Sequence, residues 1–208
     1  MKRQILLMCA SIFMACERED LLDYDCSVFP DPATSPYVLP WSVGETYPAS
    51  PHAIKDRSGQ LYAIDVLMPI GTPLRAARDG RVVFVEERYV DYDTTPGHEN
   101  VVIVDHGDGT AARYFHLTFG GAIFTVGDVV RLGELIAFSG HTGNSTEPHL
   151  HFDVIQCCEP ATVDVYLFNQ TVPVSFRNAT PIVVQRGDAA LNCGLKNGVF
   201  YTAAPYSL

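Results

Sequence analysis

Two histidines separated by a single residue are the feature of this sequence that most suggests chemistry. His149 and His151 lie in the segment PHLHFDV at residues 148–154. Side chains alternate between the two faces of a β-strand, so both imidazoles and Asp153 share one face, and the apolar residues between them face the core. Imidazole is the commonest metal ligand at neutral pH, so a metal site is one interpretation of this face. A polar outer face of a strand is the other.

Two further polar residues interrupt apolar segments. His116 closes the segment RYFHL at residues 113–117, and Asp65 lies within YAIDVLM at residues 62–68. A carboxylate in such a run is costly unless it is paired or bound to a metal, so Asp65 is either a ligand or a buried, hydrogen-bonded acid. His116 alone is equally well explained as a surface histidine at a strand end. The four residues together favour one shared site.

The composition limits the class of protein that carries such a site. The chain has 208 residues, of which 47% are hydrophobic and 18% charged, and its formal net charge is -10. This apolar fraction is sufficient for a folded core, which excludes wholesale disorder. No run of Lys and Arg occurs, which argues against a nucleic-acid partner bound through phosphate contacts.

The elements that must position these residues are predicted to be short β-strands. Gly and Pro residues separate segments that are rich in β-branched and aromatic residues, and no window has a long helical period. The segments are 61–66, 81–86, 100–105, 111–117, 134–139, 149–154, 163–168 and 172–176. The Gly-containing loop HGDGT at residues 106–110 predicts a hairpin between two of them. Many short strands at close spacing indicate a mainly β fold, an antiparallel sandwich or barrel.

The first sixteen residues are predicted to be a signal peptide. Lys2 and Arg3 precede an apolar stretch at residues 5–15 that is too short to span a bilayer, and charged residues follow at once. Cys16 follows Ala15 and resembles the cleavage site of a bacterial lipoprotein. The sequence therefore predicts export, with Cys16 lipidated and attached to a membrane in one alternative and plain secretion in the other.

The rest of the chain is predicted to have three parts. A Pro-rich tether covers residues 17–40, a folded domain covers 41–157, and a C-terminal β extension covers 158–208. Export would permit disulfides, and Cys26 and Cys193 are candidate partners, although the spacing does not fix the pairing. No CxxC occurs, which argues against a thiolate zinc site.

Several segments, taken in order, resemble the lysostaphin-type (LytM-like) zinc endopeptidases. The resemblance spans about residues 37–155, and its most specific part is PHLHF at 148–152 with the Gly-rich segment before it. The other segments are DVLMPIGTP at 65–73, AARDGRVV at 76–83, VDHGDGT at 104–110, YFHL at 114–117, GDVVRLGE at 127–134 and SGHTGNST at 139–146. The resemblance implies an antiparallel β-sandwich or open barrel of the lysostaphin-peptidase type, with short strands and long loops that form a groove.

The resemblance also implies a set of site residues around Zn²⁺. Asp65 and His151 correspond to zinc ligands, and His116 and His149 correspond to catalytic histidines. The family usually places its first ligand four residues before the Asp, where this sequence has Leu61. We expect His52 to replace it as the third ligand, because a loop at residues 53–60 can fold out and return His52 to the metal.

The implied function is hydrolysis of peptide bonds in bacterial peptidoglycan, in either stem-peptide cross-links or bridges. Three protein ligands leave a fourth zinc position open for chemistry, and segments 88–99 and 118–125 are predicted to form the groove walls. The implied location is the periplasm or cell envelope, as an outer-membrane lipoprotein, or outside the cell. Two alternatives remain: a metal-free relative that binds the wall or activates another hydrolase, and a general secreted peptidase.

Overall fold

The computed structural model describes residues 26–52, 59–157, 170–182 and 194–207. The predicted signal peptide with Cys16, Cys193 and the predicted strand 163–168 lie outside these residues. In the part of the chain that is described, no helix is long and apolar enough to span a bilayer. The helical segments there are two short 3₁₀ turns, η1 (Cys26–Val28) and η2 (Pro32–Thr34).

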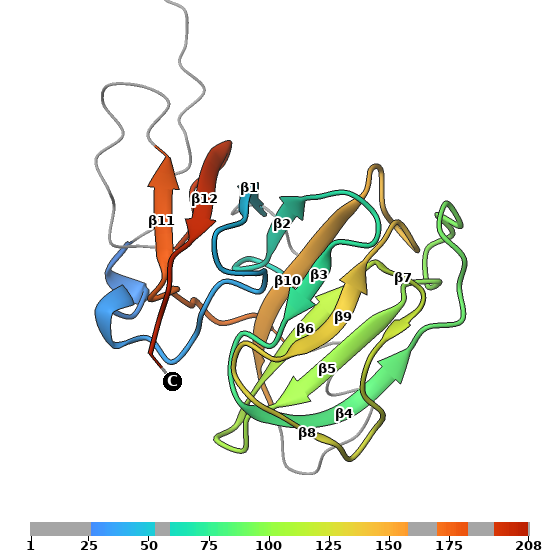
Figure 1. The fold of residues 1–208 in the computed structure, drawn as a ribbon, viewed down its shortest axis with the longest axis horizontal. Helices are drawn as coiled ribbons and strands as arrows, with labels where there is room; N and C mark the ends of the chain where they lie inside the picture. Colours follow the sequence, from blue (N-terminus) through green and yellow to red (C-terminus); the bar gives the residue numbers. More distant parts are fainter. Residues whose placement is uncertain (1–25, 53–58, 158–169, 183–193, 208) are drawn as a thin grey trace, which may run out of the picture.

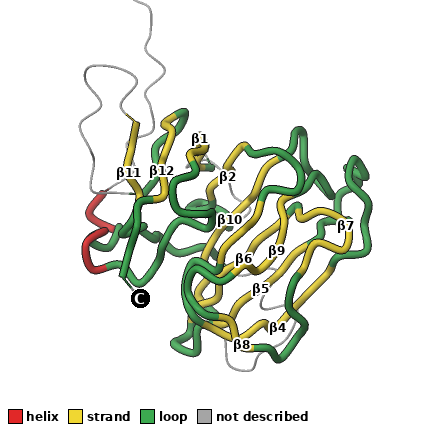
Figure 2. Tube along the Cα trace, in the orientation of Figure 1, coloured by secondary structure: helices red, strands yellow, loops and turns green. Residues whose placement is uncertain are grey.

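Twelve described strands form two antiparallel sheets (Figures 1 and 2). The larger sheet has nine strands in the order β11-β12-β1-β2-β10-β6-β5-β4-β8, and the smaller has the order β3-β9-β7. The bounds are β1 (Thr46–Pro51), β2 (Ile64–Leu67), β3 (Pro73–Arg75), β4 (Gly80–Glu86), β5 (Val101–Asp105), β6 (Thr110–Phe115), β7 (Leu117–Ala122), β8 (Val129–Val130), β9 (Leu135–Ser139), β10 (His149–Gln156), β11 (Ala179–Ile182) and β12 (Val199–Ala203).

The two sheets pack face to face over one apolar core. Val66, Leu150 and Phe152 of the larger sheet belong to the same buried cluster as Leu74 and Ile136 of the smaller sheet. The larger sheet ends at β11 on one side and β8 on the other, so the described strands do not close into a barrel. The fold is therefore a mainly β, antiparallel sandwich, as the sequence predicted.

The predicted hairpin around residues 106–110 is confirmed, because β5 pairs with β6 across this loop. The predicted strand 172–176 is wrong, since only an isolated bridge at Thr171 precedes an irregular stretch. Pro173 has no N–H to donate to a strand ladder. Val174 and Phe176 are nevertheless buried in the core, so the apolar pattern of this segment reflects packing rather than sheet pairing.

The ends of the described chain complete the sheet and the core. Tyr37, Val38 and Leu39 are at most 5% exposed, so the chain already packs onto the domain within the segment predicted as a tether to residue 40. In the segment predicted as a β extension, β11 and β12 add to the larger sheet beside β1, at the left of Figure 1. They cover the edge next to the strands that carry the site described below.

Candidate metal centre

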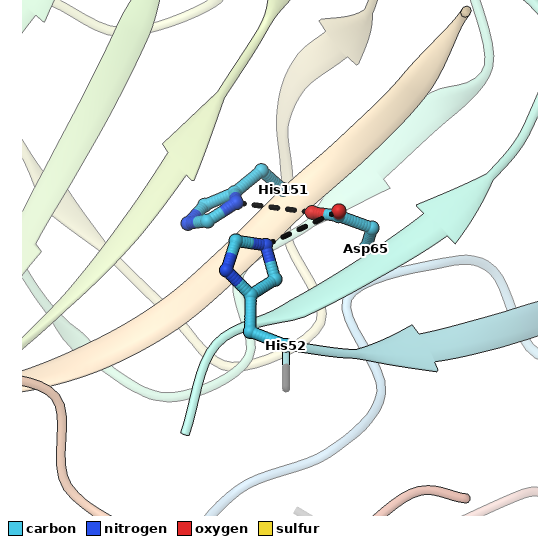
Figure 3. Close-up of side chains that lie close together, drawn as sticks. All are labelled: His52, Asp65 and His151. Atoms are coloured by element: carbon cyan, nitrogen blue, oxygen red, sulfur yellow. Dashed lines mark hydrogen bonds and ion pairs between the residues drawn. The ribbon is translucent and has the colours of Figure 1, made fainter. Parts of the chain in front are cut away.

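Three side chains meet on the outer face of the larger sheet, opposite the core. Asp65 in β2 lies directly across from His151 in β10, and His52 follows the end of β1, which pairs with the other side of β2. The backbone N–H of His52 donates to the carbonyl of Ala63, which keeps His52 beside β2. Figure 3 shows the two imidazoles next to each other, each with a dashed contact to the Asp65 carboxylate. Strand register therefore brings together residues that are up to 99 positions apart in the sequence.

The distances suit a divalent metal with nitrogen and oxygen ligands. Asp65 Oδ2 lies 3.2 Å from His52 Nε2, and Asp65 Oδ1 lies 3.0 Å from His151 Nδ1. One ligand atom from each of the three residues lies within 4.8 Å of the others. Donor atoms around a tetrahedral zinc ion are roughly 3.3 Å apart, and two imidazoles with one carboxylate are donors that zinc accepts. The group could therefore hold a metal ion with little rearrangement.

Asp65 and His151 shift each other's pKa values. Burial alone would raise the pKa of Asp65, but hydrogen bonds and charge from His151 and His52 outweigh it and hold this pKa well below its usual range. Burial opposes the charge on His151, yet Asp153 and Asp65 outweigh it and raise the pKa of His151 to about 9. Asp65 is ionised at neutral pH, and a metal ion at His151 would displace a proton.

His116 lies at the corner where the chain passes from the larger sheet to the smaller one. It follows β6 and precedes β7, and its backbone has a φ of 61°, a left-handed conformation that is rare for residues other than glycine. Its Nδ1 lies 2.6 Å from the carbonyl oxygen of Thr142. A carbonyl only accepts, so Nδ1 carries the proton and Nε2 has a free lone pair. Burial, with charges on His149 and His151, lowers the pKa of His116 to about 3.

His149 opens β10 beside the same carboxylate. Its Nδ1 donates to the carbonyl of Glu147 at 2.7 Å, and its Nε2 lies 3.6 Å from Asp65 Oδ1. Burial lowers its pKa, so the ring is neutral at pH 7. Gly140 forms an isolated bridge with His149, and a Cβ there would lie 2.3 Å from the Thr118 nitrogen. Only glycine lets β7 approach this closely, which positions the start of β10.

The five site residues line one groove. The imidazoles of His116 and His149 have ring centroids 4.5 Å apart, and the groove that they share with His52, Asp65 and His151 has a volume of about 750 Å³. The structure therefore brings together every site residue that the sequence predicted. Leu61, where the family usually places a ligand, lies in the turn before β2.

The groove walls differ in part from the prediction. The groove is lined by Arg88, Tyr89 and Glu99, which lie within the predicted wall segment 88–99. The predicted wall at 118–125 is wrong, because no residue of that segment is among those lining the groove. Most of it forms β7, which pairs with β9 in the smaller sheet. Asn144 and Thr146, in the loop before β10, take part instead.

A buried ion pair beneath the site was not assigned a role from sequence. Arg113 and Asp153 are 1% and 0% exposed, and Asp153 also contacts the His151 ring. Burial would raise the pKa of Asp153, but the charge of Arg113 and the hydrogen bond from His151 hold it below its usual range. The signal was present in the sequence, because Asp153 shares the outward face with His149 and His151, and Arg113 interrupts an apolar strand.

The remaining histidines have other partners. His98 pairs with Asp93 at 2.8 Å and is 40% exposed at its side chain. His106 donates from Nδ1 to the Asp79 carbonyl, and its Nε2 is buried. His141 is 7% exposed and lies 2.8 Å from the Ser145 hydroxyl, which in turn contacts His149. None of the three lines the groove.

The sequence profile of peptidase family M23 matches residues 59–164, which are 106 of the 208 residues. Glycyl-glycine endopeptidase ALE-1 of Staphylococcus capitis is 37% identical over 107 residues, 51% of this chain and 27% of that protein. Peptidoglycan DD-endopeptidase ShyA of Vibrio cholerae is 33% identical over 116 residues, 55% of this chain and 25% of that protein. The chain thus spans about a quarter of the length of these curated relatives.

The catalytic domain of the antimicrobial peptidase lysostaphin from Staphylococcus simulans is 32% identical and has a TM-score of 0.40, with 55% of this chain and 82% of that chain covered. The predicted resemblance to lysostaphin-type peptidases is confirmed by the profile match and the relatives. The matched segment begins just before β2 and includes Asp65, His116, His149 and His151, four of the five residues around the groove, and the chain belongs to peptidase family M23.

Proposed function

We propose that this chain is a zinc metallo-endopeptidase that hydrolyses peptide bonds of bacterial peptidoglycan. The observation that carries the proposal is the convergence of His52, Asp65 and His151 beside His116 and His149 in one groove. The relatives support the reaction class, because one is named a glycyl-glycine endopeptidase and another a peptidoglycan DD-endopeptidase. Stem-peptide cross-links and glycine bridges are accordingly the two substrate classes to compare.

His52, Asp65 and His151 are the proposed zinc ligands. Their donor set of two imidazoles and one carboxylate, with ligand atoms within 4.8 Å of one another, suits that ion. When bound there, zinc supplies Lewis acidity that polarises a peptide carbonyl and acidifies water. Three protein ligands are typical of catalytic zinc sites, whereas structural sites usually have four.

His116 and His149 are the proposed catalytic residues. Both rings are neutral at pH 7 and are anchored through Nδ1 to carbonyl oxygens, so each presents Nε2 to the groove with its lone pair available. One of them accepts a proton from the attacking water at Nε2; the other takes up a proton at Nε2 before it stabilises the developing oxyanion or protonates the leaving amine. Their anchored orientation keeps both ready without a conformational search.

We also propose that the chain acts in the cell envelope after export. The support is the basic and apolar start of the sequence, with Cys16 at a lipoprotein-like cleavage site. A periplasmic or outer-membrane lipoprotein and a secreted enzyme are the two forms to separate. Mass analysis of the mature N-terminus separates them, because lipidation adds acyl chains to Cys16 and simple secretion does not.

Digestion of purified sacculi tests the proposed activity. We expect the protein to release peptides whose masses identify the bond that is cut, a chelator to stop the release, and added zinc to restore it. Casein serves as the comparison substrate. Digestion of casein but not of sacculi would favour the general peptidase, and absence of both activities together with absence of stoichiometric zinc would favour the metal-free relative.

His52 is tested by the variant His52→Ala. We expect zinc affinity to fall at least about 100-fold, the upper range for losing a partner of a ligand, since this variant removes a ligand itself. Chelator competition measures the affinity. The matched control is His98→Ala, which removes a histidine that also pairs with an aspartate but does not line the groove. Unchanged zinc affinity in His52→Ala would remove His52 from the ligand set.

A further inference from the structure

We propose that Asp153 and Arg113 are positioning residues that determine which ring nitrogen His151 presents to the metal. The inference rests on the proposed zinc centre and extends it to a buried pair that touches neither metal nor substrate. Asp153 Oδ1 and Oδ2 lie 2.7 Å from Nε and Nη2 of Arg113, and Asp153 Oδ2 lies 3.2 Å from Nε2 of His151. The carboxylate therefore links the guanidinium to the imidazole.

Strand register builds this link. Asp153 lies two residues after His151 on β10 and so points to the same face, while Arg113 lies directly across from Asp153 on β6. The three side chains are 0–4% exposed. Such burial makes an unpaired carboxylate very costly, and the two-pronged contact with Arg113 supplies the opposite charge that keeps Asp153 ionised.

The anchors of the neighbouring histidines show why this matters. On the same strand, His149 is held through Nδ1 by a backbone carbonyl and presents Nε2 to Asp65. His151 is held through Nε2 by Asp153 and presents Nδ1 to Asp65. Two imidazoles on the same face of one strand thus present different ring nitrogens to Asp65: His149 presents Nε2 and His151 presents Nδ1. Only the anchor of His151 is a charged side chain, so that ring is the one whose orientation a substitution can release.

A second contact restrains the same ring. Phe115, on β6, meets the His151 ring edge to face at a centroid distance of 5.4 Å, and the Arg113 guanidinium lies 5.2 Å from the centre of the Phe115 ring. Arg113 therefore acts on His151 along two routes, through the carboxylate and through the aromatic ring. Carboxylates that orient a metal-binding histidine typically account for 10–100-fold in metal affinity.

The variant Asp153→Asn tests the proposal because it keeps the shape of the side chain and removes its charge. We expect zinc affinity, measured by chelator competition, to fall 10–100-fold. We also expect the rise in melting temperature on adding zinc to shrink, because stabilisation by a ligand follows its affinity. The control is Tyr114→Phe on β6, the strand that carries Arg113, which removes the buried hydrogen bond from the Ala77 N–H to Tyr114. Tyr114→Phe should lower the melting temperature both with and without zinc and leave zinc affinity unchanged.

A double variant keeps the test decisive if Asp153→Asn does not fold. Arg113→Met with Asp153→Leu removes both buried charges at similar volume, an exchange that proteins often tolerate. We expect it to fold and still to bind zinc 10–100-fold more weakly, because His151 has lost its Nε2 partner. Wild-type affinity in either folded variant would overturn the positioning role. If the wild-type chain itself bound no zinc, the proposed metal centre would be the idea that fails.

Discussion

The variant Asp65→Ala is expected to lose bound zinc and to hydrolyse peptidoglycan at least about 10³-fold more slowly than the wild type, and His151→Ala is expected to do the same. Asp65 contacts both imidazoles, so its loss removes a ligand and the negative charge that holds His52 and His151 together. A metal contributes several kcal/mol of transition-state stabilisation, and about 4 kcal/mol corresponds to about 10³ in rate. Metal analysis and a sacculus digestion measure the two effects.

A matched aspartate separates this effect from a general loss of charge. Asp93 pairs with His98 at 2.8 Å, much as Asp65 pairs with His52, but it does not line the groove. Asp93→Ala should therefore retain zinc and activity. A full equivalent of zinc in purified Asp65→Ala would contradict the ligand assignment.

The variant His116→Ala is expected to keep its zinc and to lose turnover by about 10²–10⁴-fold, the range for a general acid or base. Within the described part of the chain, His116 forms no hydrogen bond with the three proposed ligands, and its nearest ring is that of His149 at 4.5 Å between centroids. Its lone pair at Nε2 is the group that the reaction would use. Zinc content and kcat, measured on the same sample, distinguish loss of chemistry from loss of metal.

The backbone at His116 requires a second variant. Its φ of 61° is a conformation that asparagine tolerates better than alanine, so His116→Asn retains the corner between the sheets with less strain. Both variants should show the same loss of turnover. Wild-type activity in folded His116→Asn would show that this histidine takes no part in proton transfer.

The sequence by itself determined the strands and the identities of most groups at the site. Alternation in PHLHFDV placed His149, His151 and Asp153 on one face, and the burial of Leu150 and Phe152 confirms that the opposite face meets the core. The same reasoning failed for residues 172–176, where Pro173 prevents pairing and the apolar residues pack without a strand. Local patterns report burial more directly than hydrogen bonding.

Only the tertiary structure decided how these groups meet. The pairing of β1 with β2 brings His52 to Asp65, and no local pattern encodes a contact across a variable insert. Arg113 and Asp153 are 40 positions apart in the sequence, and their pairing likewise depends on the register between β6 and β10. Register is set by packing the whole apolar face at once, because a slip by one residue would turn every core side chain outward. The residue types are therefore local information, whereas their convergence on one centre is a property of the assembled sheet.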